Sequence, residues 1–234
     1  MKKKILISLI IVLIPCLIIV ISLYSAGVSQ QESIEWVEKN NGTVEFEMKS
    51  WAGSIPFESS KKLIGRRITA ASFNGANIDD LNKLEIFEEC ESLKFENCDI
   101  KDYSSIGSLV KIKKLSLLNS KVESLDFLKK LENLEYLELT NSSAVDLSAL
   151  SELQKLKTIK LTGSDVNNIT PLRNLNQIEV LDLSATKVEN ILPLQSLKNL
   201  KKLNVEQTNV PQQHIAHIQN AIQTCIISST SKQL

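Results

Sequence analysis

The stretch LDLSATKVENILPL at residues 181–194 decides the fold of this 234-residue chain. Its apolar residues stand at positions 1, 3, 8, 11 and 14 of a unit that continues with leucine at positions 17 and 20. The unit recurs every 22 residues, and its first position is occupied by Ala71, Leu93, Leu115, Leu137, Ile159, Leu181 and Leu203. A fixed period of this length indicates an architecture of stacked, equivalent units.

The spacing of the apolar residues predicts what each unit looks like. Positions 1 and 3 alternate as in a short strand with one buried face, whereas the later positions keep the spacing near three of a short helical or 3₁₀ segment. No unit can bury its own apolar side, so the units must stack with their strands parallel at about 4.8 Å. Residues 71–224 are therefore expected to form an α/β leucine-rich repeat solenoid of seven repeats, with a parallel strand face and a convex helical or 3₁₀ side. The apolar positions are filled throughout except at Gln213 and Gln219, both in the last repeat, which is expected to act as the C-terminal cap.

The open ends of a solenoid must be covered. Residues 28–67 are expected to form an N-terminal cap and connector, with a helix at 33–39, Gly42 at its C-terminal turn and a strand at 43–47. Residues 228–234 are polar and are expected to form a loose tail.

Position 6 of each repeat is small, and in five repeats it carries a hydroxyl group. We expect these hydroxyls to bond neighbouring backbone groups in the turn after the strand, which is a structural role. The residues at this position are Ala76, Cys98, Ser120, Ser142, Ser164, Thr186 and Thr208.

The amino-terminal segment differs from the rest of the chain. Residues 5–24 (Ile5 to Tyr24) contain no charge, and as a helix they would be roughly 30 Å long, which matches a bilayer core. Lysines occupy positions 2–4, and the positive-inside rule then leaves residues 1–4 as a cytoplasmic tip. We expect a single-pass transmembrane signal anchor at 5–24 that precedes the solenoid, with the C-terminal domain outside the cell membrane, in the periplasm or extracellular space.

Two alternatives remain for this segment. Ser25, Ala26 and Gly27 could serve as a cleavage site, in which case the mature protein would be secreted. Cys16 could carry a lipid, although Pro15 stands where a lipobox has a small residue and the apolar run continues beyond it.

The charge balance argues against nucleic acid as a partner. The chain has 27 Lys+Arg and 27 Asp+Glu, and without the lysines at positions 2–4 the remainder carries 24 positive and 27 negative groups. A nucleic-acid binder held by phosphate contacts needs a basic surplus.

No catalytic motif is recognisable, so we expect no enzyme, no cofactor, no metal and no small-molecule substrate. His214, His217 and Cys225 are too few ligands for a closed zinc site, and an enzymatic role for them is the weakest alternative. Cys90 and Cys98 are expected to be buried thiols, although a disulfide between them stays open in an oxidising compartment.

The repeats resemble bacterial leucine-rich repeat proteins with 22-residue units. The internalin type shares the endings Ile169–Leu172 and Ile191–Leu194, and a second type shares the pattern L-x-L-x-x-T-x-V of Leu181–Val188 and a last coil with a cysteine, as in Ile222–Ile227. The resemblance covers about residues 31–227 and implies the solenoid fold. Internalins usually have Asn at position 6, which this chain lacks, so no adhesion or invasion role is carried over.

The outward positions of the strands are where a solenoid presents side chains to a partner. They carry mixed charges with isolated apolar points, which suits a protein-protein contact. We expect a membrane-anchored extracytoplasmic protein that binds an unidentified protein partner through this face; the alternative is a structural envelope scaffold or spacer without a specific partner. The candidate binding residues are Lys114, Leu118, Tyr136, Glu138, Thr158, Lys160, Val180, Asp182 and Lys202.

Overall fold

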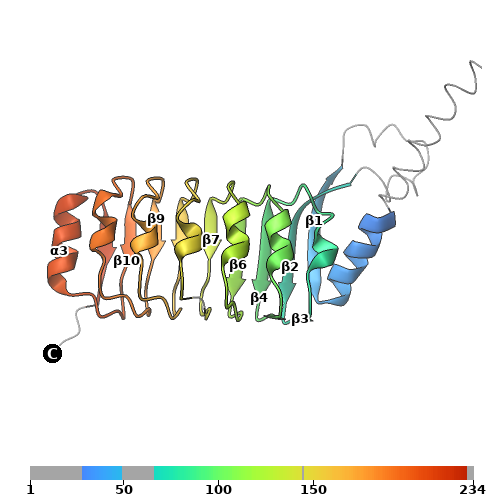
Figure 1. Cartoon of the computed structure of the whole chain (residues 1–234), viewed down its shortest axis with the longest axis horizontal. Coiled ribbons are helices and arrows are strands. Elements are labelled where there is room, and N and C mark those ends of the chain that lie inside the picture. The colour runs from blue at the N-terminus through green and yellow to red at the C-terminus, as the bar shows by residue number, and fades with distance from the viewer. Residues whose placement is uncertain (1–27, 49–65, 144, 231–234) are drawn as a thin grey trace, which may run out of the picture.

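The computed structural model describes residues 28–48, 66–143 and 145–230. Its main sheet has nine strands in the order β1-β2-β4-β6-β7-β8-β9-β10-β11. All neighbours from β2 to β11 are parallel, and only β1 is antiparallel to its neighbour. The coils stand side by side, with strands on one face and short helical segments on the other (Figure 1). The expected leucine-rich repeat solenoid is thus confirmed.

From β2 onward, the strands of the main sheet shorten along the chain. They are β1 (Gly42–Met48), β2 (Arg66–Asn74), β4 (Ser92–Glu96), β6 (Lys114–Leu118), β7 (Tyr136–Glu138), β8 (Thr158–Lys160), β9 (Val180–Asp182), β10 (Lys202–Asn204) and β11 (Ile226–Ser228). A second, two-stranded sheet consists of β3 (Asn77–Ile78) and β5 (Asp99–Ile100).

The convex side consists mainly of 3₁₀ helices, as the spacing of three predicts. These are η2 (Asn82–Leu84), η3 (Ser104–Ser108), η4 (Asp126–Lys130), η5 (Ser148–Leu150), η6 (Thr170–Leu172) and η7 (Leu192–Ser196). The α-helix α3 (Gln212–Ala221) takes their place in the last coil.

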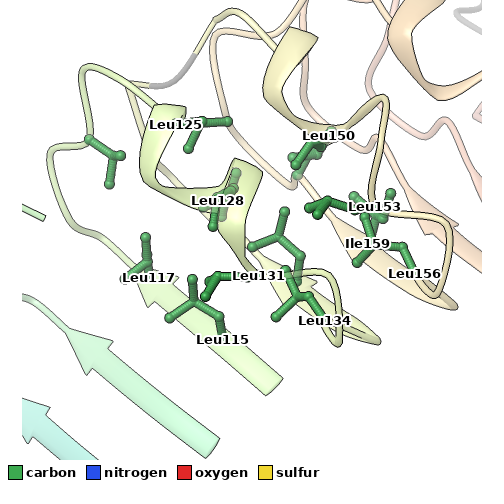
Figure 2. Close-up of a cluster of buried hydrophobic side chains, with 14 of the residues drawn as sticks. Leu115, Leu117, Leu125, Leu128, Leu131, Leu134, Leu150, Leu153, Leu156 and Ile159 are labelled. Atoms are coloured by element: carbon green, nitrogen blue, oxygen red, sulfur yellow. The ribbon is translucent and has the colours of Figure 1, made fainter. Parts of the chain in front are cut away.

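The core consists mainly of leucine and isoleucine side chains that point inward from both sides of each coil. Leu115 pairs in register with Leu137, and Leu137 with Ile159, so equivalent side chains stack along the solenoid. Leu128 and Leu131 come from the 3₁₀ side and meet these strand residues (Figure 2). All five side chains are fully buried, and each such burial stabilises the fold by about 1.5–3 kcal/mol.

The turn after each strand requires a left-handed residue at position 5. Asparagine tolerates this conformation, and in the first coils its side chains also bond one another. The Asn119 amide donates to Asn97 Oδ1 at 2.9 Å, and the Asn141 amide donates to Asn119 Oδ1 at 2.8 Å. The residues with positive φ at this position are Gly75, Asn97, Asn119, Asn141, Gly163, Ala185 and Gln207.

The hydroxyl groups at position 6 behave as expected in part. Ser120 donates to Leu118 O at 3.0 Å, and Thr186 donates to Leu183 O at 2.6 Å. The Ser142 and Ser164 hydroxyl oxygens, in contrast, are buried without a hydrogen-bond partner among the described residues.

The side chain at position 10 accepts a hydrogen bond from the first backbone N–H of each 3₁₀ helix. The Asp102 carboxylate, for example, accepts a hydrogen bond of 2.8 Å from the backbone N–H of Ser104, the first residue of η3. Such bonds satisfy a donor that has no partner within the helix. The residues that accept them are Asp80, Asp102, Ser124, Asp146, Asn168 and Asn190.

Alternating charges line the edge of the sheet directly before the strands. We call this row the charge ladder; it consists of Glu91, Lys113, Glu135, Lys157, Glu179 and Lys201. Each lysine pairs with the glutamate of the preceding coil, at 2.9, 2.6 and 2.7 Å along the chain. The ladder therefore links the coils in pairs.

The N-terminal end is covered by a helix at residues 28–39, drawn in blue in Figure 1, and by β1. Ile34 and Val37 of this helix are buried. The left-handed residue at its end is Asn41, with φ 55, and not Gly42 as expected from sequence. Gly42 is needed for space, since a Cβ there would lie 2.5 Å from Val37 Cγ1.

The expected fold class requires one correction. Among residues 28–48, 66–143 and 145–230, no helix is long and apolar enough to cross a membrane, so the transmembrane helix that was expected to precede the solenoid is not part of the described fold. The anchor expected at 5–24, the tip at 1–4 and most of the connector, at 49–65, lie outside the described residues. Of the expected tail, Ser228 belongs to β11.

Candidate protein-binding face

The outward residues of the parallel strands form what we call the strand face. Its leading row contains the first residue of each strand from β4 to β11: Ser92, Lys114, Tyr136, Thr158, Val180, Lys202 and Ile226. Its second row contains Lys94, Ser116, Glu138, Lys160, Asp182 and Asn204. Its third row contains Glu96, Leu118, Thr140, Thr162, Ser184 and Glu206.

The backbone register places the candidates of the leading row side by side. Lys114 pairs with Tyr136, Tyr136 with Thr158, Thr158 with Val180, and Val180 with Lys202. Tyr136, Thr158 and Val180 are half-buried, and both lysines are exposed. The structure thus brings five of the nine candidates into one row.

Glu138 is the centre of a polar cluster in the middle of the face. The Tyr136 hydroxyl donates to Glu138 Oε2 at 2.7 Å, and Ser116 donates to the same oxygen at 3.3 Å. Lys160 Nζ lies 3.7 Å from Glu138 Oε1 and 5.6 Å from the centre of the Tyr136 ring. Burial raises the pKa of Tyr136, and its hydrogen bond to the Glu138 carboxylate raises it further. The cluster holds the Tyr136 ring as a preformed, neutral contact surface.

Asp182 has its own partners within the face. Its Oδ1 accepts hydrogen bonds from the Ser184 hydroxyl, at 2.6 Å, and from the Ser184 backbone N–H, at 2.9 Å. Asn204 donates to the other oxygen at 3.3 Å. Leu118, in the third row, is half-buried and lies away from this cluster at the end of β6.

The face is hollowed at its N-terminal end. A cavity of about 460 Å³ lies over β2 and β4, where the outward side chains are small: Ala70, Ser72 and Ser92. Lys94 and Lys114 line its border. The strand face therefore ends in a hollow at β2 and β4.

Known structures share this architecture. Internalin C2 from Listeria monocytogenes matches with a TM-score of 0.63 and 26% identity, over 68% of this chain and 69% of that chain. The chain is an internalin-like leucine-rich repeat protein of the bacterial kind.

Two further structures are similar to this internalin-like protein in fold only. Internalin F from Listeria monocytogenes matches with a TM-score of 0.52 and 19% identity, over 67% of this chain and 54% of that chain. A leucine-rich repeat protein of Leptospira interrogans matches with a TM-score of 0.58 and 18% identity, over 62% of this chain and 38% of that chain. No protein-family model and no curated protein sequence matches the chain.

Sequence reasoning missed one member of the face in this internalin-like protein. Ile226 pairs in register with Lys202 and is 66% exposed, whereas the neighbouring Ile227 packs against the core. A strict step of 22 residues from Lys202 arrives at Thr224, two residues too early. The isoleucine pair at 226–227, one outward and one inward, was the only signal that could have revealed the longer last coil.

The histidines of the internalin-like protein serve its C-terminal cap. A His214 ring nitrogen lies 3.2 Å from Glu189 O, and a His217 ring nitrogen lies 3.0 Å from Gln195 Oε1. Both contacts fix α3 against the preceding coil. Within the described part of the chain, no three His, Cys, Asp or Glu side chains are grouped so that they could hold a metal ion.

The thiols are also structural. Cys90, Cys98 and Cys225 are free and buried, so the possible Cys90–Cys98 bridge is absent. Burial raises the pKa of Cys90 to about 11, which keeps this thiol protonated at neutral pH. A protonated, buried thiol is a poor nucleophile. The candidate functional site among the described residues is therefore the strand face.

Proposed function

We propose that this internalin-like protein holds another protein on its strand face, outside the cytoplasm. The observation that carries this proposal is the registered leading row, in which a half-buried aromatic ring and an aliphatic side chain lie between exposed lysines. Aromatic anchors surrounded by polar groups are typical of protein-binding surfaces. The clamping of Tyr136 by Glu138 and Lys160 supports the proposal, because an ordered side chain loses little entropy on binding.

The test is the double variant Tyr136→Glu and Val180→Glu in crosslinking pulldowns from cells. Two new carboxylates in the contact row would be desolvated by a partner, so recovery of a specific partner should be lost. Unchanged recovery would contradict the assignment to the strand face.

The matched control is the double variant Val110→Glu and Val145→Glu. These valines are 50% and 47% exposed and lie outside the strands, so the same charge is added away from the face. The control should recover the partner as the unchanged chain does. Circular dichroism melting of both variants separates loss of binding from loss of folding.

The extracytoplasmic location is supported by the sequence alone, through the lysines at positions 2–4 and the uncharged segment 5–24. Protease added to intact cells should degrade the repeat domain if it lies outside, or the domain should be found in the medium if it is released. A domain that becomes accessible only after the cytoplasm is opened would contradict the location.

The second candidate is a scaffold or spacer, and the polar network of the face favours it. Glu138 and Asp182 already have partners within the chain and need none from another protein. Under this alternative, a chain shortened by middle coils would keep its function, whereas a binding protein would lose part of its contact surface.

A further inference from the structure

The three rows of the strand face hold four lysines and four carboxylates, so the face is neutral as a whole, but the charged residues of its leading row are lysines only. Lys94 pairs with Glu96 at 2.7 Å, and Lys160 pairs with Glu138. Lys114 and Lys202, by contrast, have no ion pair among the described residues, although both are exposed. The face carries both signs, but the cations of its leading row remain available to a partner.

These two lysines have a defined separation. They begin β6 and β10, and β7, β8 and β9 lie between them in the sheet. Four steps of about 4.8 Å place them roughly 19 Å apart across the strands. The residues between them in the row, Tyr136, Thr158 and Val180, are uncharged.

We propose that the leading row recognises an acidic segment of the protein partner, laid across the strands. Two carboxylates of this segment pair with Lys114 and Lys202, and uncharged residues between them cover Tyr136 and Val180. At about 3.3 Å per residue, an extended segment places these carboxylates about six residues apart. This inference rests on the proposed function and specifies the chemistry of the partner.

The neighbouring charges are consistent with this assignment. In the charge ladder beside the row, Glu91, Glu135 and Glu179 are each paired with a lysine, so they do not neutralise the row. Asp182 and Glu206 have no ion pair among the described residues. Asp182 lies in the second row, where Ser184 and Asn204 donate hydrogen bonds to its carboxylate, and Glu206 belongs to the third row, farther from the leading row. Ile226 extends the row beyond Lys202 and adds an apolar contact for a residue that follows the second carboxylate.

The experiment is a selection of phage-displayed random peptides on the full-length chain. The peptides are long enough to span both lysines. The selected peptides should carry Asp or Glu in pairs about six residues apart, with uncharged residues between them. The double variant Lys114→Glu and Lys202→Glu should bind these peptides with about tenfold lower affinity. A selection on this variant should yield peptides with paired Lys or Arg.

The control is Lys83→Glu together with Lys130→Glu, which changes the net charge equally on the convex side. It should leave the selected peptides unchanged. Acidic pairs that bind this control and the Lys114/Lys202 variant equally would overturn the proposal, as would a selection without acidic pairs or sedimentation showing that a second copy occupies the face.

The outcomes also separate this proposal from the function on which it rests. Peptides without acidic pairs that nevertheless lose binding in the Tyr136→Glu and Val180→Glu variant would overturn the lysine assignment and leave the strand face as the binding site. Peptides insensitive to both sets of substitutions would overturn both proposals.

Discussion

The first three coils and the last four solve the same packing problem with different side chains. In the first coils the strands β2, β4 and β6 have 9, 5 and 5 residues, whereas β7 to β10 have 3 each. The first coils also contain a chain of ring contacts. Phe73 and Phe95 stack at 4.8 Å, and Tyr103 and Phe127 at 5.8 Å. The last coils are almost purely aliphatic.

The difference follows from what each half adjoins. Phe73 receives the edge of Trp36 at 5.8 Å, so the aromatic side chains join the N-terminal cap to the first coils. The later coils stack only on copies of themselves, and leucine at equivalent positions is sufficient there. The contrast teaches that aromatic packing is concentrated where the solenoid meets its N-terminal cap.

The largest change in the free energy of unfolding is expected from substitutions at the same repeat position in both halves. Phe95 and Leu161 both occupy position 3 and are fully buried. Phe95→Ala should lower the free energy of unfolding by about 4 kcal/mol, and Leu161→Ala by about 3 kcal/mol, measured in urea. Phe95→Leu isolates the ring contacts and should still cost about 1 kcal/mol. A larger loss for Leu161→Ala would contradict the importance of the aromatic contacts.

A smaller effect is expected at Gly163, where the row of hydrogen-bonded side chains Asn97, Asn119 and Asn141 ends. A Cβ at Gly163 would lie 2.1 Å from Asn141 Oδ1, and φ there is 69°. Gly163→Ala should therefore destabilise the protein by about 2 kcal/mol, seen as a lower urea midpoint. Ala185 already holds the equivalent left-handed position, and Ala185→Gly should gain less than about 1 kcal/mol. Equal tolerance of both substitutions would contradict this account.

The smallest effect should have the same sign in both halves. Hydrogen bonds from Lys113 and Lys157 lower the pKa values of Glu91 and Glu135, respectively. Because the folded pKa lies below the unfolded one, this stabilisation is present above the unfolded pKa and is lost as pH falls through the folded pKa. Lys157→Gln should raise the pKa of Glu135 in NMR titrations and flatten the loss of stability below about pH 5. Lys113→Gln should raise the pKa of Glu91 by less, because Arg67 Nη2 remains 3.3 Å from Glu91 Oε1.

The fold was predictable because the physical cause of the repeat is local and periodic. Inward positions must be apolar in every coil, so the period is visible in a single sequence. The left-handed turn at position 5 was less visible, since Asn119, Gly163 and Ala185 satisfy one backbone requirement with different side chains.

The candidate site was predictable as a surface but not as a set of contacts. The alternation of strand residues places Tyr136 and Val180 outward, and this follows from sequence. Two partners of Glu138, Ser116 and Lys160, come from two other strands, so only the three-dimensional register identifies them. Ile226 was missed because the last coil departs from the period.

The charge ladder limits how this solenoid can change in length. Its signs alternate, with Lys157 on Glu135 and Lys201 on Glu179. Removing one coil would set glutamate beside glutamate or lysine beside lysine at the new junction, whereas removing two adjacent coils restores opposite charges. Opposite charges stay adjacent only when coils are added or removed in pairs, although the core packing would allow a change by a single coil. Natural lengthening, shortening or engineered trimming of this chain is therefore least costly in steps of two.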